Sequence, residues 1–200
     1  IFRPGQSDGT GLAAGEGCIL TSGPPSITAS SSPVFETRVR LESPSGSSGG
    51  WGFENLASNN SDAGATSSVL AMFKYNLNGN YIATVKNGGS AGANETFVDT
   101  GVAPSASDFD TFRIELTLDN ALFLINGKVV ADITTNIPSF IMGFIFRHEG
   151  VSATPTTPRT NVDYVKVWSD DPPGNLAGGT EGGDSFEGED ILASPSEADL

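Results

Sequence analysis

The sequence has very little of the chemistry on which several protein classes depend. It contains one cysteine, one histidine and only ten basic residues, for a net charge of −14. No apolar run approaches the roughly 18 residues of a membrane-spanning helix. A single cysteine excludes an internal disulfide framework and a cysteine-based zinc site. The scarcity of basic residues argues against nucleic acid and anionic membrane surfaces as partners.

The acidic residues are unevenly distributed. Residues 170–200 contain nine of them and no basic residue, whereas the rest of the chain has 15 acidic and ten basic residues. This C-terminal arm has the composition of a disordered acidic tail. Two interpretations stay open: a partner holds it through Phe186, Ile191 and Leu192, or it packs on its own domain. We predict a homo-oligomer, or assembly with other structural subunits, through the terminal arms.

Turn residues and short alternating runs are what the chain has in abundance. With 25 Gly and 12 Pro and no helical periodicity, the sequence predicts an all-β fold, an antiparallel β-sandwich over residues 33–169. Residues 1–32 form a Gly/Ser/Pro-rich lead-in, in which we expect Cys18 to be a buried strand residue. Because Ile1 is neither an initiator Met nor part of a signal-peptide pattern, we expect a processed form or a fragment. Strands are expected near residues 34–42, 50–56, 68–76, 80–86, 95–99, 109–118, 121–126, 128–134, 139–148 and 161–168.

Residues 109–133 carry the clearest local signal. Asn126-Gly127 stands between two apolar runs and is the strongest short-range indication of a hairpin, because both residues accept positive φ. Asp119-Asn120 is expected to form the preceding turn. In the first strand Phe112, Ile114, Leu116 and Leu118 alternate with polar residues, which indicates one buried and one wet face.

Three segments resemble the concanavalin A-like lectin/glucanase jelly roll, a fold that also includes laminin-G-like domains. They are FETRVRLES at 35–43, DTFRIELTLDNALFLINGKVVADI at 110–133 and NVDYVKVWSD at 161–170, in the order that this family shows. The resemblance implies a jelly-roll sandwich with extended arms. Similar modules occur in phage and viral structural proteins and in secreted proteins, so function has to be argued from the site.

The carboxylates that the resembling glucanases use are missing where we expect them. These enzymes have a Glu-x-Asp-x-(x)-Glu strand, which sets two carboxylates about 5 Å apart. The equivalent region, from Trp51 to Lys86, contains only Glu54 and Asp62. The Gln-Ile-His strand of related alginate lyases is also absent. We therefore expect no enzymatic activity.

We expect a non-catalytic module that serves as a structural, decoration or fibre component on the surface of a phage or viral particle. The missing catalytic strand, the negative charge and the two arms motivate this hypothesis. A carbohydrate-binding module for polysaccharides or host glycans is the first alternative, and a divergent glycan hydrolase or lyase is the second. The expected location is a virion surface or the extracellular space.

Candidate binding residues follow from aromatic and basic side chains on neighbouring expected strands. Trp51, Tyr75 and Tyr81 could stack on sugar rings, although aromatic residues on one face of a sandwich usually form its core. Arg147 and the single histidine, His148, could contact an anionic sugar, or simply end a buried strand.

One metal site is implied by the resemblance. In the resembling glucanases the Asp of the final strand contributes to a calcium site, and Asp163 holds this position here. Calcium favours such carboxylate and carbonyl oxygens. The alternative is an ordinary surface aspartate. No other cofactor is expected.

Overall fold

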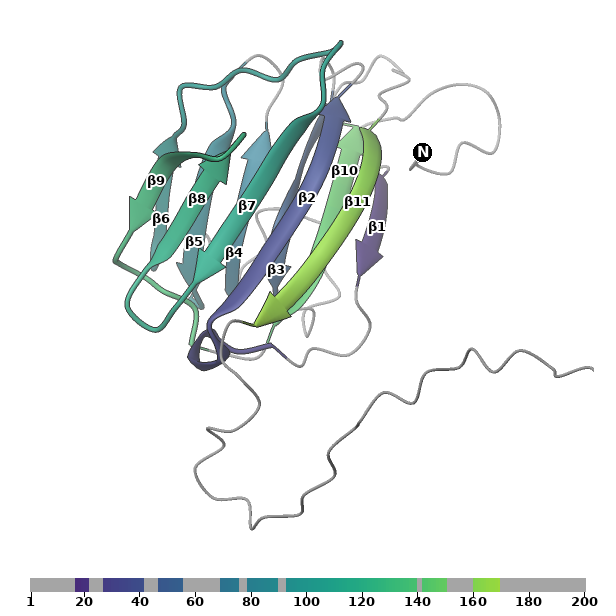
Figure 1. The fold of residues 1–200 in the computed structure, drawn as a ribbon. Helices are drawn as coiled ribbons and strands as arrows, with labels where there is room; N and C mark the ends of the chain where they lie inside the picture. The colour runs from purple at the N-terminus through teal and green to yellow at the C-terminus, as the bar shows by residue number, and fades with distance from the viewer. Residues whose placement is uncertain are drawn as a thin grey trace, which may run out of the picture.

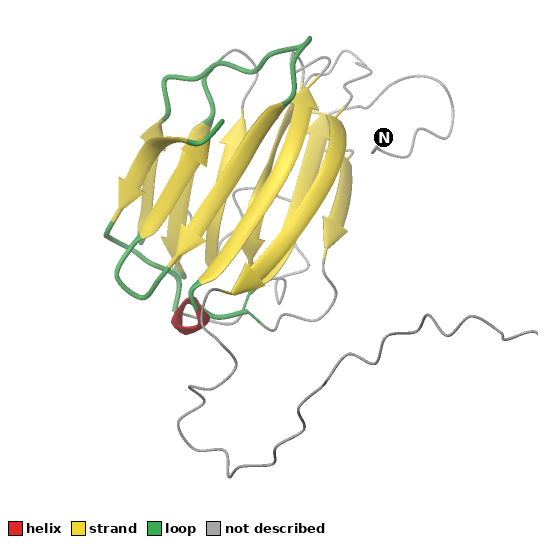
Figure 2. Cartoon of the chain, in the orientation of Figure 1, coloured by secondary structure: helices red, strands yellow, loops and turns green. Residues whose placement is uncertain are grey.

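The computed structural model describes residues 17–21, 27–41, 47–55, 69–75, 79–89, 93–139, 142–150 and 160–169; at 17–21, 47 and 148–150 it describes the backbone alone. These residues form two antiparallel sheets that face each other (Figure 1). The only helix among them is one 3-10 turn, η1 (Ala29–Ser31), as Figure 2 shows. The predicted all-β sandwich is therefore confirmed. The described residues contain no helix that is long and apolar enough to cross a bilayer.

Six strands form one sheet, in the order β1-β10-β3-β4-β5-β6, and five form the other, in the order β11-β2-β7-β8-β9. The first sheet consists of β1 (Gly17–Thr21), β3 (Ser47–Glu54), β4 (Val69–Tyr75), β5 (Ile82–Asn87), β6 (Glu95–Asp99) and β10 (Gly143–Gly150). The second consists of β2 (Pro33–Leu41), β7 (Asp110–Leu116), β8 (Ala121–Ile125), β9 (Lys128–Ile133) and β11 (Thr160–Ser169). In Figure 1 the five-stranded sheet lies in front of the six-stranded sheet.

The β7–β8–β9 meander follows from its turn chemistry. Asn126 and Gly127 have φ angles of 51° and 76°, which is the backbone that the Asn-Gly pair predicts. The other turn is longer than expected, because β7 ends at Leu116 and β8 begins at Ala121. Leu118 consequently lies in that turn, where it is 66% exposed. The prediction that Leu118 continues the buried face is wrong.

The core is an aromatic cluster between the two sheets. Phe112 of β7 packs edge-on against Trp51 of β3 and Tyr81, with ring centroids 4.7 and 4.8 Å apart. Phe73 of β4 meets Phe112 and Phe123 at 5.1 Å each. Edge-to-face geometry adds to the free energy gained by burying these rings. Alternation along each strand then leaves the residues between them on the outer faces of the sheets.

The lead-in contributes to the sandwich. Strand β1, which contains Cys18, pairs with β10 at the edge of the six-stranded sheet, and Ile27 forms a backbone bridge with Met142. Ala29 is buried in the core. Residues 170–200 lie outside the described residues, so assembly through the terminal arms stays a prediction.

Candidate functional site

The outer face of the six-stranded sheet carries polar side chains in aligned rows. Register places Glu54, Leu70, Lys86 and Glu95 opposite one another on four successive strands. In antiparallel pairs such neighbours point to the same side of the sheet. The next row contains Met72, Thr84 and Phe97, and the one after it Lys74, Ile82 and Asp99.

A cleft of about 380 Å³ lies on this face. Its most exposed large side chain is Phe97 of the edge strand β6, at 71%. Opposite, Lys74 Nζ donates a hydrogen bond to Glu95 Oε1 over 2.9 Å, so the two charges neutralise each other inside the cleft. Its lining consists of Ser48, Gly49, Lys74, Tyr75, Ile82, Thr84, Glu95 and Phe97.

Close strand approach explains the glycines of β3 beside this cleft. A Cβ on Gly49 would lie 2.2 Å from the Arg147 carbonyl oxygen, and one on Gly50 would lie 2.4 Å from that of Phe73. Neither backbone atom can move away without breaking the ladder. These two positions therefore accept no side chain. Gly50 leaves part of the outer face bare, whereas a Cβ on Gly49 would point inward at the Tyr75 ring.

A buried ion pair crosses the same face. Arg147 Nη2 donates to Glu54 Oε2 at 3.2 Å, and the two side chains are 5% and 6% exposed. Burial raises the pKa of the Glu54 carboxyl, while the charges of Arg147 and Lys74 oppose that shift. The pair joins β3 to β10 across 93 residues of sequence.

Of the residues predicted to bind sugars, three belong to the core. Trp51, Tyr75 and Tyr81 are only 1%, 2% and 0% exposed. Tyr75 and Tyr81 pack on Trp51 with ring centroids 5.8 and 5.9 Å away. Their rings have no free face on which a sugar could stack, so the structure argues against the predicted role. Phe53 and Phe73 lie two residues from Trp51 and Tyr75 on the same inward side of their strands, and both are also fully buried.

Arg147 is on the outer face, as a sugar-contacting residue has to be, but its guanidinium is committed to Glu54. The side chain of His148 lies outside the described residues. Phe97, Lys74 and Glu95 are the cleft residues that the sequence analysis missed. The alternation of Glu95, Phe97 and Asp99 was a usable signal, since an aromatic ring flanked by acidic residues indicates a wet face.

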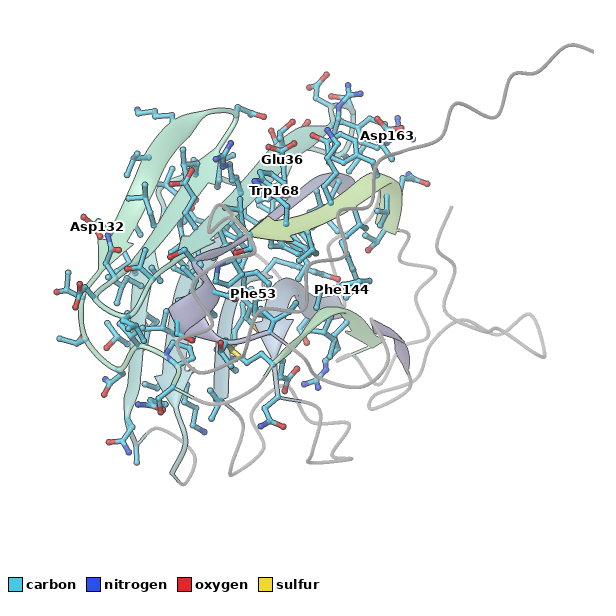
Figure 3. All side chains as sticks on the ribbon, turned by 60° about the horizontal axis from the view of Figure 1, so that its bottom comes forward. Glu36, Phe53, Asp132, Phe144, Asp163 and Trp168 are labelled. Atoms are coloured by element: carbon cyan, nitrogen blue, oxygen red, sulfur yellow. The ribbon has the colours of Figure 1, made fainter. Side chains whose placement is uncertain are left out.

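Asp163, the residue expected at a calcium site, is paired with a basic side chain. Its carboxylate accepts a hydrogen bond from Arg38 Nη1 at 2.9 Å, so the Arg38 guanidinium balances its charge. No group of three or more His, Cys, Asp or Glu side chains that could hold a metal occurs in the described part of the chain. Asp163 lies with Glu36 and Trp168 on the side of the five-stranded sheet that faces away from Phe53 and the core (Figure 3). A calcium site that combines Asp163 with backbone carbonyl oxygens stays a prediction.

Strand β4 lies within residues 51–86, the region in which the sequence analysis expects the glucanase carboxylates. Its outward residues are Leu70, Met72 and Lys74, and the first two form a small apolar cluster with Ile145. Glu-x-Asp-x-Glu is therefore not reproduced on β4. Carboxyl groups reach the same face from other strands, namely Glu54 from β3 and Glu95 from β6.

Solved structures share this fold. No protein-family model matches the sequence, and no curated protein is similar to it. A β-1,3-1,4-glucanase (lichenase) from a mouse hindgut metagenome has a TM-score of 0.56 at 9% identity, covering 74% of this chain and 69% of the other. A native glycosidic hydrolase has a TM-score of 0.54 at 18% identity, covering 68% and 64%, less than two thirds of that enzyme. The pseudo β-1,3-glucanase of Mycobacterium tuberculosis has a TM-score of 0.52 at 14% identity, covering 77% and 75%.

These likenesses show the concanavalin A-like jelly-roll fold of the glucanases. They also correct two expectations. The non-catalytic structural module of a phage or viral particle is overturned, because the solved structures with this fold include glycoside hydrolases such as the lichenase and a laminarinase. The expectation of no enzymatic activity falls with it. That expectation rested on two missing motifs, and their absence excludes particular arrangements of catalytic residues rather than hydrolysis.

Proposed function

We propose that this protein is a divergent glycoside hydrolase that holds a polysaccharide in the cleft on the outer face of the six-stranded sheet. The observation that carries the proposal is the exposed Phe97 ring beside the Lys74–Glu95 pair. A sugar presents C–H groups on its ring faces and hydroxyl groups around its edge. An aromatic platform next to fixed charged groups matches both features.

Glu95 is the cleft carboxyl group that can touch a substrate, and we assign proton transfer to it. Glycosidases place a second carboxyl group about 5–9.5 Å away. Glu54 shares the row of Glu95 but stands three strands away, about 14 Å at the usual strand spacing. Glu54 is therefore not its partner, and none of the other described residues on this face supplies one.

Turnover is the direct test. The purified chain is incubated with β-glucans, β-galactans and β-mannans, and newly formed reducing ends are measured. We expect hydrolysis of at least one polymer, and a loss of at least about a hundredfold in the variant Glu95→Gln, because the proton-transferring group is gone. Glu115→Gln is the matched control: it removes a carboxylate that is also paired with a basic residue, Arg113, but on the other sheet. Equal losses in both variants would contradict the role of Glu95.

Glycan binding at the same cleft is the second candidate function, favoured because the described residues of this face place no second carboxyl group at glycosidase distance from Glu95. Calorimetric titration with oligosaccharides tests it separately from turnover. We expect Phe97→Ala to weaken binding about five- to tenfold, the equivalent of one aromatic stacking contact. Leu118→Ala, which removes an exposed apolar side chain from the β7–β8 turn, is expected to leave binding unchanged.

A further inference from the structure

Two polar side chains on β5 lack a hydrogen-bond or ion-pair partner among the described residues, and the Thr84 hydroxyl is itself buried. Thr84 lines the cleft and is 1% exposed, and its Oγ1 has no hydrogen-bond partner. Lys86, two residues further along, is 3% exposed, and no hydrogen bond or ion pair joins it to the described residues. Alternation places both on the outer face, about 7 Å apart.

The nearest candidate partner for Lys86 is already taken. Glu95 stands directly opposite Lys86 on β6, yet its carboxylate bonds to Lys74 instead. A buried hydroxyl without a partner is unfavourable, and Lys86 has no counter-charge among the described residues. The free protein tolerates both groups beside a cleft, which is the arrangement that an incoming ligand completes.

We propose that the cleft selects an anionic polysaccharide, whose carboxylate or sulfate group contacts Lys86 while a neighbouring oxygen bonds to Thr84. This inference rests on the proposed function, because it names the substrate class for the same cleft. Because Glu95 bonds to Lys74, an anion at Lys86 would supply the missing counter-charge. Charge-assisted hydrogen bonds are stronger than those between neutral groups. A neutral glycan offers Lys86 only hydroxyl groups.

The overall negative charge does not oppose this selection at physiological ionic strength. Nine of the acidic residues lie beyond residue 169. Charges farther away than the Debye length of about 8 Å are largely screened, so the local groups dominate. On this face Lys74 pairs with Glu95 and Arg147 with Glu54, whereas Lys86 has no ion-pair partner among the described residues.

Calorimetric titration with matched pairs of charged and neutral sugars tests the inference. The titration is done at 0.15 M salt, where the Debye length is about 8 Å. Mannuronate and mannose oligomers, both β-1,4-linked hexamers, differ only in a carboxylate at C6, and glucuronate and glucose oligomers form a second pair. Sulfated cello-oligosaccharide distinguishes sulfate from carboxylate as the recognised group. We expect at least one anionic oligomer to bind at least tenfold more tightly than its neutral counterpart.

The variant Lys86→Met keeps the length of the buried stem and removes the charge. We expect it to abolish the preference for the anionic oligomer, whereas Lys128→Met, at an exposed lysine of β9, keeps that preference. Thr84→Val removes the hydroxyl at constant volume and is expected to weaken the anionic complex.

Equal affinity of the wild-type protein for both members of every pair overturns the inference and leaves the proposed function standing. Absence of binding to every oligomer, charged or neutral, overturns both. Because the wild-type comparison decides between these outcomes, the test does not depend on the folding of any variant.

Discussion

The Glu54–Arg147 pair shows how strongly the surroundings of a single residue determine the effect of its charge. Both partners are almost fully buried, so each depends on the other to offset the loss of water. The pair of Arg38 and Asp163 has the same chemistry, but these side chains are 46% and 48% exposed. Solvent already stabilises their charges, so the second pair contributes little.

We therefore predict that Arg147→Met lowers the free energy of unfolding by about 3 kcal/mol, because it leaves a buried carboxylate uncompensated. Adding Glu54→Leu should recover part of this loss. Arg38→Met is the control and should cost less than about 1 kcal/mol. Urea unfolding measures all three variants, and a loss for Arg147→Met no larger than for Arg38→Met would contradict the prediction.

The pH dependence of stability is a second consequence of the burial of Glu54. Its pKa is raised above 4.5, so the folded protein holds this proton more tightly than the unfolded chain does. The resulting stabilisation is complete below pH 4.5 and is lost as the pH rises through the higher pKa of the folded state.

Hydrogen bonds lower the pKa values of Asp99 and Asp108, so these groups act in the opposite sense and below pH 3.8. The difference in unfolding free energy between wild type and Glu54→Gln should therefore fall as the pH rises above 4.5. Chemical denaturation across a pH series measures it. A difference that stays constant, or that grows with pH, would show that burial does not raise this pKa.

At the scale of an element, the hairpin of β8 and β9 is fixed by the residues of its own turn. Asn126 also fixes the turn through its side chain: its Oδ1 accepts from the Thr111 N–H, and its Nδ2 donates to Asp110 Oδ1, both at 2.8 Å. Turn backbone and side chain therefore tie β7, β8 and β9 together at one point.

At this turn, Gly127→Ala should lower the unfolding free energy by about 1 kcal/mol, because an alanine at a φ of 76° is strained even in open space. Gly79→Ala is the matched control, since a Cβ there also meets nothing within 4 Å and its φ is not positive. Thermal or chemical unfolding distinguishes the two. Equal effects would show that the Gly127 backbone is not the cause.

Local patterns predicted the elements well and the outer-face contacts poorly. The alternation of Phe112, Ile114 and Leu116 requires no knowledge of distant residues, and it identified β7. The contact between Glu54 and Arg147 depends on which strands become neighbours and in which register, and this is decided by loops and core packing. Leu118 was misplaced for a related reason, because its turn begins two residues earlier than the alternation suggests.

At the scale of the whole molecule, the sandwich and the acidic arm separate cleanly in composition. The hydrophobic core extends from Ala29 to Phe146, with partly buried residues of β11 packed against it. Residues 170–200 have the composition of a disordered acidic tail. This arm contains nine acidic residues and no basic one, so its removal changes the net charge from −14 to −5.

Truncation after Ser169 should therefore leave the midpoint of thermal unfolding within about 2 °C of the full chain, a shift below that of a 1 kcal/mol change in a domain of this size. Light scattering on the same protein tests the predicted assembly through the arms. A smaller particle after truncation would support that role, and an unchanged one would contradict it. A large fall in the midpoint would show that the arm is part of the folded unit.

The small cluster of Leu70, Met72 and Ile145 has a consequence for the time scale on which water reaches the backbone. It covers the outside of the six-stranded sheet where Trp51 and Phe73 cover the inside. Backbone amides between the two apolar layers have no wet side from which exchange can begin. Deuterium should therefore enter the centre of β3 and β4 only when the whole domain opens, and the slowest amides there report its global stability directly.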